Sequence, residues 1–426
     1  MNDFYPRIEL QDIPAPQREL FGIKKRAWLV LSCFIVTLSF LLFQGGKLSF
    51  MVFTIVSILC IYLGLGQWSG IRKSKGVRTL VASGHESIME AGSTLGVKIK
   101  LNIPGFWPVP YVLIKDHLQR HNGGEQVFEA SLIPDWKRNG TMEYRTPPLR
   151  RGVYTFTNTD CSTEDIFGFF EHKGTLALEH SFSVLPLRTT IREWKKLQQM
   201  LKGMHHHSST ARAMRETTQI NGAREYNYGD RLSRIHWNAT AKTGTLKSKE
   251  FERESLPKTI VILDRAKHHY ANQEQFELAV SITASLIEFG TKRDLAFGLL
   301  STGANSVYFE PKYGQSQHMQ ILNHLVVVEA DGEFSLDQVL KERTKSLLPG
   351  TFVAIISPQI GEFMFSALAW INQRQMSPCH IWVRDEKAVK QADKQAEWLK
   401  QLRIKGYLGY DVPSLDELSQ VLGGRG

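Results

Sequence analysis

Two long apolar runs near the N-terminus constrain the fold of this chain more than any other feature. Residues 27–43 and 48–65 contain seventeen and eighteen residues without a charged side chain, and only residues 44–47 separate them. Each run is near the lower end of the roughly 17–25 residues that a helix needs to cross a bilayer. We therefore expect a two-helix transmembrane hairpin over residues 24–75, with the lipid bilayer as its partner.

Two other interpretations explain parts of this pattern. A cleavable signal peptide would use Lys24, Lys25 and Arg26 as its charged start, and a buried hairpin in a soluble core would also be apolar. However, the first run is long for a signal peptide, no small-residue cleavage pattern follows it, and the second run begins almost at once. These features favour two membrane spans.

Basic residues outside the runs predict the orientation of the hairpin. They precede the first run and follow the second, whereas the turn between the runs contributes Lys47. Because cytoplasmic segments carry the excess of Lys and Arg, both termini are expected in the cytoplasm. The sequence thus predicts a multi-pass protein of the cell membrane with two spans and a cytoplasmic tail over residues 1–23. The basic residues counted are Lys24, Lys25, Arg26, Arg72, Lys73, Lys75 and Arg78.

The composition excludes several classes of protein. The chain is 42% hydrophobic and 22% charged, which is typical of folded domains and not of disordered or collagen-like chains. Its four cysteines lie far apart, so neither a disulfide scaffold nor a zinc motif is present. The net charge of +10 favours an anionic partner, and anionic lipid satisfies it without nucleic acid. A nucleic-acid interface over the basic residues 192–258 is an alternative, but we expect no nucleic-acid partner.

The rest of the chain divides into three segments. Residues 77–188 contain short alternating runs separated by turn residues, which predicts a β-sandwich-like domain of immunoglobulin type without its Cys and Trp hallmarks. Residues 189–258 form a basic connector with helical and polar stretches. Residues 259–426 alternate apolar strands with helical patterns, which predicts a doubly wound α/β domain. The expected fold class is therefore membrane-anchored α/β plus β.

The connector contains the densest cluster of unusual residues. We expect Asp230 to cap a helix that begins at Arg231 and ends at Gly244, with Leu232, Ile235, His236 and Ala239 on one face. One interpretation is a hydrogen-bonded clamp that joins the connector to the α/β domain. The other is a surface for a protein partner, because Arg, Tyr and Trp supply most interface energy. The residues of this motif are Arg224, Glu225, Tyr226, Gly229, Asp230, Ile235, His236, Trp237, Lys249 and Glu250.

These motifs resemble the signature of a bacterial family, domain-of-unknown-function family fifty-eight. Its members carry Arg-Glu-Tyr, Gly-Asp, Ile-His-Trp or Ile-Asp-Trp, Ala-Arg and a late acidic stretch, and here Lys242 replaces the usual Arg. Upstream, residues 150–154 and 165–170 resemble the family's Arg-Arg-Gly-x-Tyr and Asp-Pro-Phe-Gly-Leu-Phe motifs, with Ile166 in place of Pro. The family motif in the β domain comprises Arg150, Arg151, Gly152, Tyr154, Asp165, Phe167 and Gly168.

The resemblance implies an α/β domain similar to a von Willebrand factor type A domain. It also implies a membrane protein whose genes neighbour a MoxR-type AAA ATPase and a transglutaminase-like membrane protein, so both are expected partners. Type A domains that bind Mg²⁺ use Asp-x-Ser-x-Ser after the first strand, because a hard cation needs oxygen ligands. Here Ala266 and His268 replace the two serines that would follow Asp264. We therefore expect no metal and no cofactor, and Asp264 is the one metal candidate in the α/β domain.

The carboxyl ends of the predicted parallel strands are the place where such folds bind ligands. Asp264, Ser301 and Ser357 fall at those ends. A hydrolytic site assembled from Asp264, His236 and Glu225 would rest on residue types alone, and the sequence has no GxSxG, HExxH or phosphate-binding loop.

We therefore expect no enzyme but a membrane-anchored cytoplasmic adapter or scaffold that docks a partner. The MoxR-type ATPase is the expected partner, in an envelope-associated or chaperone-like complex. The alternative is an enzyme that acts on cell-envelope precursors at the inner membrane face. The three histidines at 205–207 resemble a metal-binding tract, but no acidic or Cys ligand lies near them, which favours a solvated loop.

Overall fold

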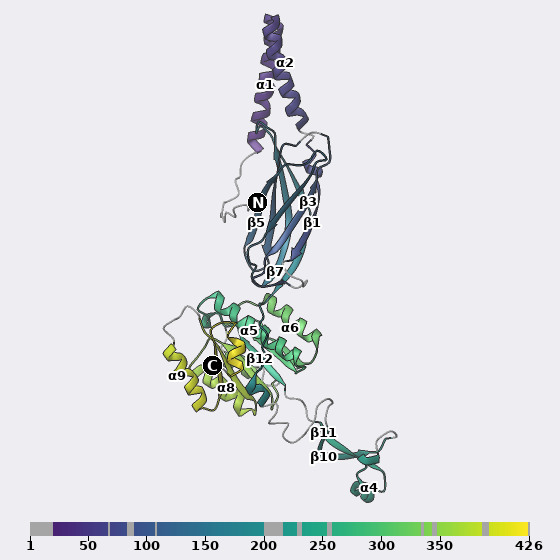
Figure 1. Cartoon of the computed structure of the whole chain (residues 1–426), viewed down its shortest axis with the longest axis vertical. Helices are drawn as coiled ribbons and strands as arrows, with labels where there is room; N and C mark the ends of the chain where they lie inside the picture. The colour runs from purple at the N-terminus through teal and green to yellow at the C-terminus, as the bar shows by residue number, and fades with distance from the viewer. Residues whose placement is uncertain are drawn as a thin grey trace. The chain divides into compact units, whose positions relative to one another are not determined.

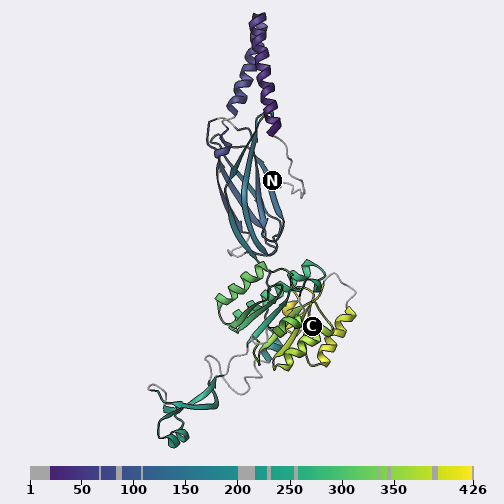
Figure 2. The same ribbon diagram turned by 180° about the vertical axis from the view of Figure 1, so that it is seen from behind.

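The computed structural model describes residues 20–424, with gaps at 67–68, 83–88, 107–108, 200–215, 228–231, 254–257, 334–335, 343–346 and 386–391. It contains two compact units, Met1–Leu185 and Pro186–Gly426, and we describe each by itself (Figures 1 and 2). The expectation of a mixed α/β chain with more than one sheet is confirmed.

Two helices occupy the apolar runs of the first unit. They are α1, Leu20–Gln44, and α2, Gly46–Gly66, and the chain reverses between them at Gly45 and Gly46, whose φ angles are +60° and +91°. Among the described residues, one segment, Gly46–Lys73, is long and apolar enough to cross a membrane. The apolar helix Trp28–Gln44 is shorter. One candidate span near the N-terminus is thus present, and the second span stays a prediction.

The rest of the first unit consists of two sheets. The smaller has the order β1-β3-β6, and the larger has the order β2-β9-β7-β4-β5, with β8 paired to β7. Along β3, Leu95, Val97, Ile99 and Leu101 are buried and alternate with less buried residues, as the period-two pattern predicts. The strands are β1 Lys75–Ala82, β2 Met89–Glu90, β3 Leu95–Asn102, β4 Val112–Arg120, β5 Glu125–Leu132, β6 Asn139–Arg145, β7 Gly152–Glu164, β8 Glu171–Leu176 and β9 His180–Leu185.

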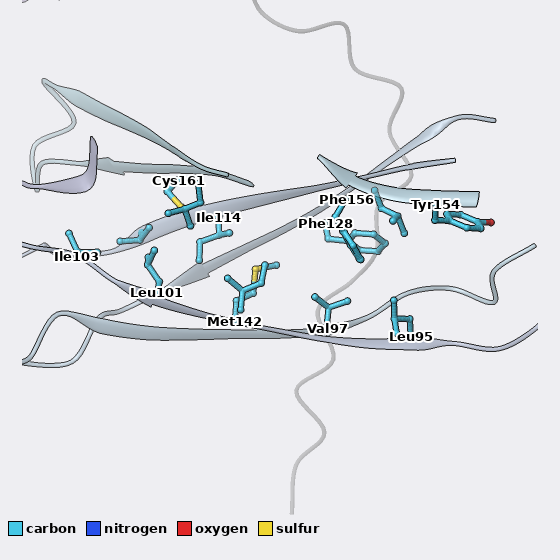
Figure 3. Close-up of a cluster of buried hydrophobic side chains, with 14 of the residues drawn as sticks. Leu95, Val97, Leu101, Ile103, Ile114, Phe128, Met142, Tyr154, Phe156 and Cys161 are labelled. Atoms are coloured by element: carbon cyan, nitrogen blue, oxygen red, sulfur yellow. The ribbon is translucent and has the colours of Figure 1, made fainter. Parts of the chain in front are cut away.

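The two sheets share one hydrophobic core (Figure 3). Val97, Ile114 and Phe156 are among its fully buried members. One charged pair lies beside it: the Arg78 guanidinium contacts the Asp116 carboxylate, with 4% and 0% of the side chains exposed. Arg78 therefore cannot face lipid headgroups, and it does not belong to the basic residues that set the expected orientation. Arg72, Lys73 and Lys75 remain exposed after the second apolar run.

The predicted basic connector differs from expectation. Besides helical segments, its described part contains an antiparallel pair of strands that was not predicted, β10, Glu216–Glu225, and β11, Lys247–Arg253. Between them lie the 3₁₀ turn η2, Leu232–Arg234, and the short helix α4, Trp237–Thr243. Apolar alternation is nearly absent from β10, whose sequence is ETTQINGARE, so the pattern gave no strand signal. We call residues 216–253 the signature arm.

The second unit contains a six-stranded sheet with the order β14-β13-β12-β15-β16-β17. All neighbours are parallel except the edge strand β14, which is antiparallel to β13. The apolar runs at 259–264, 295–300, 351–356 and 380–383, which the sequence predicts as strands, each overlap a strand of this sheet, whereas β14 and β17 were not predicted. The strands are β12 Thr259–Asp264, β13 Phe297–Thr302, β14 Val307–Lys312, β15 Phe352–Ser357, β16 Ser377–Val383 and β17 Leu408–Val412.

Helices cover both faces of this sheet (Figure 1). Ile260 and Ile262 of β12 belong to the apolar cluster that includes residues of α7, α8 and α9. Because side chains alternate along a strand, Val261 and Leu263 point to the other face, where α5 lies. The helices are η3 Lys267–His269, α5 Gln273–Lys292, α6 Gln315–Val327, α7 Leu336–Glu342, α8 Glu362–Gln373, α9 Ala392–Ile404 and α10 Leu418–Leu422.

Candidate functional site

The helix of the signature arm begins later than the sequence predicts. Helix α4 starts at Trp237 rather than Arg231, and its N-cap is His236, whose Nδ1 accepts a hydrogen bond from the backbone N–H of Ala239 at 3.1 Å. Gly244 ends the helix with φ +71°, as predicted. The proposed cap Asp230 and its neighbour Gly229 lie outside the described residues.

Hydrogen bonds hold the arm in its own compact shape. The backbone N–H of His236 donates to Lys247 O at 2.8 Å, and Ile235 forms a bridge with Ser248. The Glu225 carboxylate pairs with the Lys247 ammonium at 3.3 Å. The described motif residues thus contribute mainly to the arm itself. Arg224 donates from its guanidinium to Glu225 O, the backbone N–H of Tyr226 donates to Leu246 O, and Lys249 and Glu250 lie opposite Ala223 and Gly222 in the strand pair.

The predicted apolar face of the arm is split. Ile235 is buried against β11, whereas Leu232 is 72% exposed. Trp237, at the first position of α4, is 68% exposed, and Leu246 is exposed as well. A clamp between two elements would bury its Trp, so this exposure favours the interpretation as a partner surface.

The Arg-Arg-Gly-x-Tyr motif of the β domain is structural. Arg151 is fully buried, and its carbonyl accepts a hydrogen bond from the Arg120 guanidinium at 2.7 Å. The Tyr154 hydroxyl donates to Arg150 O at 2.9 Å. Gly152 has φ +153°, which residues with a side chain rarely adopt, and a Cβ there would lie 2.8 Å from Arg120 Nε. These contacts shape the start of β7.

The second family motif forms a loop closed by Asp165. The Asp165 carboxylate accepts hydrogen bonds from the backbone N–H groups of Phe167 at 2.9 Å and Phe170 at 2.6 Å. Gly168 takes φ +67° in the same turn. The loop holds Phe167 exposed, with its ring edge-on to Tyr62 of α2 at 5.9 Å between centroids.

Asp264 is the centre of a buried polar cluster at the carboxyl edge of the six-stranded sheet. Its Oδ2 accepts a hydrogen bond from the Ser357 hydroxyl at 2.7 Å and lies 2.7 Å from Nδ1 of His269. Its Oδ1 accepts from the backbone N–H of Ala266 at 3.0 Å. Asp264 and Ser357, both predicted at this edge, are therefore brought together, and His269 joins them.

A second layer of hydrogen bonds supports Ser357. The Trp398 indole N–H donates to Nδ1 of His380 at 3.2 Å, and Nε2 of His380 lies 3.2 Å from Ser357 O. Because the indole only donates, Nδ1 accepts and Nε2 carries the ring proton. Burial lowers the pKa of His380 to about 4, so the ring is neutral near pH 7.

Arg265 lies beside this cluster, and sequence reasoning did not find it. Its guanidinium donates to Ser301 Oγ at 3.3 Å, to Asp331 Oδ1 at 2.6 Å and to Glu329 O at 2.9 Å. Ser301 thus contacts the cation rather than Asp264. The position of Arg265 directly after the strand-end residue Asp264 was the sequence signal that could have indicated its place in the site.

Gly303 makes room for this cation. A Cβ there would lie 2.5 Å from both Arg265 Cζ and Asp331 Oδ1. We expect Gly303→Ala to destabilise the second unit by about 1–3 kcal/mol, because it displaces the ion pair. Urea unfolding of the full chain in detergent, followed by Trp fluorescence, measures the loss.

The matched control is Ala304→Ser at the exposed next position. In an Arg265→Ala background the effect of Gly303→Ala should shrink, because the two residues are coupled. An undiminished effect there would contradict the explanation.

The residues around Asp264 do not fit Mg²⁺. Both carboxylate oxygens already accept hydrogen bonds from the protein, and the Arg265 guanidinium lies against Ser301. His268, at the second replaced serine, contacts the His269 ring instead. Among the described residues, no three His, Cys, Asp or Glu side chains are grouped to hold a metal. The three histidines at 205–207 lie outside those residues.

The hydrolytic site considered from the sequence does not have the expected partners. Asp264 is bonded to His269 and Ser357, His236 caps α4, and Glu225 pairs with Lys247. In the cluster that does form, the Ser357 hydroxyl donates to the carboxylate, so it is not directed to the imidazole as a nucleophile would be.

Comparison with known proteins supports the resemblance found in the signature. The model of the family described as "Protein of unknown function DUF58" matches residues 222–390, which include part of the arm and most of the sheet. The "Uncharacterized protein YeaD" of Bacillus subtilis (strain 168) is 25% identical over 338 residues, which cover 75% of this chain and 80% of that protein. Membrane anchoring and the von Willebrand-like detail are not part of these matches.

Similarity to solved structures is low. Proximal thread matrix protein 1 from the mussel byssus is 14% identical, with a TM-score of 0.28, over 39% of this chain and 45% of that one. The chain thus spans less than half of that protein. The CARDB domain of a Pyrococcus furiosus protein is 14% identical, with a TM-score of 0.17, over 26% of this chain and 89% of that one. Scores this low carry no argument about fold or function.

Proposed function

We propose that this chain is a membrane-anchored adapter that docks a protein partner through its signature arm. The observation that carries the proposal is the exposure of Leu232 and Trp237 on an arm held together by its own hydrogen bonds. Trp is the residue type most often found at energetic hot spots of protein interfaces. An exposed apolar pair on a preformed element is therefore suited to binding.

The anchor in this proposal is a pair of spans formed by α1 and α2. The exposed apolar side chains of Phe50, Ile58 and Ile61 on α2 support it, because lipid rather than water would surround them. The basic residues that flank the runs support a cytoplasmic position of both termini in this proposal. Removing Arg78 from that count leaves the conclusion unchanged, because Arg72, Lys73 and Lys75 remain exposed on the same side.

We propose a von Willebrand factor type A-like fold for the second unit. A parallel sheet with one antiparallel edge strand and helices on both faces supports it. The Asp264 cluster would then keep the edge of the sheet in shape through hydrogen bonds and not through a cation.

The partner in this proposal is a MoxR-type AAA ATPase, with a transglutaminase-like membrane protein in the same complex. Both come from the family resemblance. The arm is the docking element, and the anchor holds it at the membrane. The complex would be envelope-associated or chaperone-like.

We expect Trp237→Ala to weaken binding of the ATPase at least tenfold, because truncating a hot-spot residue typically costs about 2 kcal/mol or more. Binding of the full chain in detergent micelles to the purified MoxR-type ATPase of the same cell is measured by biolayer interferometry. Leu232→Ser tests the second exposed side chain.

The control is Phe363→Ser on α8, which removes an equally exposed apolar side chain outside the arm. It should leave the affinity unchanged. Equal affinities for Trp237→Ala, Leu232→Ser and the parent chain would overturn the arm as the docking element, and absence of binding by the parent chain would overturn the choice of partner.

The alternative, an enzyme acting on cell-envelope precursors, has one supporting observation. His269 is oriented by the buried Asp264 carboxylate, as a general base often is. A reaction abolished by His269→Gln, with the fold intact, would favour this alternative over the adapter.

A further inference from the structure

Several connections of the β-sandwich gather at the end where the chain enters it. Strand register pairs Lys75 of β1 with Asn102 of β3, and Asn102 with Asn139 of β6. In the other sheet, Val112 of β4 pairs with Leu132 of β5, and β7 turns back to β8 after Glu164. The described residues of three loops, 103–106 with 109–111, 133–138 and 165–170, therefore lie at the same end as the start of β1. We call these three loops the entry loops.

The entry loops expose large apolar side chains at their tips. Trp136 is fully exposed, and Ile133 is 81% exposed in the same loop. The other two loops contribute exposed side chains of the same kind. These are Phe106, Ile166 and Phe167. Exposed Lys137 lies in the same loop as Trp136, and exposed Arg72 and Lys73 precede β1. Aromatic tips beside cations are typical of protein surfaces that enter the lipid headgroup region.

A short connection ties this end to helix α2. The helix ends at Gly66, and Ile71 is already buried in the sandwich core. Five residues span at most about 17 Å, so the entry end cannot move far from the end of the helix. The Arg138 guanidinium in the entry loop donates to Ser69 O, which fixes the connection further. The Tyr62 hydroxyl of α2 lies 3.4 Å from the backbone N–H of Ile166.

We propose that the entry loops insert their apolar tips into the headgroup region of the bilayer that holds α2. The proposal rests on the membrane anchor proposed above. Trp136, Ile133 and Phe106 enter the interface, while Lys73 and Lys137 contact anionic lipid headgroups. A lipid surface suits these residues better than a single protein partner, because they project from three separate loops next to an apolar helix. In this proposal the entry end of the sandwich is in direct contact with the bilayer surface.

An environment-sensitive fluorophore tests the depth of the loops in reconstituted full-length protein. Cys33 and Cys60 are replaced by Ala, while the buried Cys161 and Cys379 remain because they do not react in the folded protein. The dye NBD is attached at Trp136→Cys in vesicles of phosphatidylcholine and phosphatidylglycerol that contain doxyl-labelled lipid. We expect a blue-shifted spectrum and strong quenching by the doxyl group.

Two further sites make each outcome decisive. NBD at Ile58→Cys, on the exposed side of α2, shows whether the anchor lies in lipid. NBD at Asn122→Cys, in the β4–β5 turn at the other end of the sandwich, shows the signal expected in water. Quenching at positions 58 and 136 but not at 122 supports the inference. Quenching at 58 alone overturns it and leaves the anchor standing, whereas no quenching at 58 overturns the anchor. Phe106→Cys repeats the measurement if Trp136→Cys fails to fold.

Discussion

Asp116→Ala is expected to destabilise the β-sandwich by about 3–5 kcal/mol, because it leaves a buried guanidinium without its counter-ion. Asp116 is fully buried, and the Arg78 guanidinium beside it lies 4.2 Å above the Phe156 ring. A loss of this size is a large part of the stability of a domain.

The Asp116 carboxylate also organises its polar neighbours. The Thr159 hydroxyl donates to Oδ1 at 2.8 Å, and the Tyr144 hydroxyl donates to Oδ2. Burial and the Asp116 charge raise the pKa of Tyr144 well above its usual value, so this hydroxyl stays protonated and keeps donating. Three side chains from the two sheets, those of Arg78, Tyr144 and Thr159, thus depend on one carboxylate.

Urea unfolding of the full chain in detergent, read from far-ultraviolet circular dichroism, measures the loss. The control is Glu143→Ala, which breaks the exposed pair with Lys98 and should cost less than about 1 kcal/mol. A double substitution, Arg78→Met with Asp116→Leu, should recover much of the stability, because replacing both partners leaves no unpaired charge. Equal effects of Asp116→Ala and Glu143→Ala would contradict the buried pair.

Acidification is expected to destabilise the second unit through two buried histidines. Burial lowers the pKa of His380 to about 4, and burial with the nearby Arg265 charge lowers that of His324 to about 4. An unfolded His has a pKa near 6.5. Between these values the unfolded chain binds more protons than the folded one, so stability is full above about pH 6.5 and falls as the pH drops towards 4. The loss approaches about 3 kcal/mol for each His.

The pH dependence of unfolding, followed by intrinsic Trp fluorescence between pH 7.5 and 4.5, checks this expectation. His380→Gln should flatten the dependence, because glutamine does not titrate, although the variant is less stable at every pH. His121→Gln, at an exposed turn of the first unit, is the control and should leave the slope unchanged. A slope that survives His380→Gln and His324→Gln together would show that other groups titrate.

The sequence predicted the elements whose pattern is set by burial. Residues 260–263 are all apolar because both faces of a central parallel strand are covered. The alternation of apolar and basic residues over 97–101 predicts a half-buried strand, and β3 of the sandwich lies there. The end of α4 at Gly244 was also predicted, because a left-handed turn there favours glycine.

The remaining features depend on contacts between distant residues. Strand β10 pairs with β11 through backbone hydrogen bonds, which any side chain permits, so its polar sequence carried no strand signal. From the sequence, Arg78 was counted among the basic residues near lipid, because its partner Asp116 is distant in the sequence and only the fold brings the two together. Of the candidate site, the meeting of Asp264 with Ser357 was expected from the strand ends, whereas His269 and Arg265 were not.

The strand register of the signature arm brings its two ends together, so the arm can be replaced as a unit. Glu216 at the start of β10 pairs with Arg253 at the end of β11, so the chain leaves and returns at neighbouring points. A segment with adjacent ends can be lengthened, shortened or swapped without changing the spacing of the chain on either side. A chimera that carries residues 216–253 of a relative is therefore expected to fold with the six-stranded sheet unchanged, and it would transfer the partner preference that we propose for the arm.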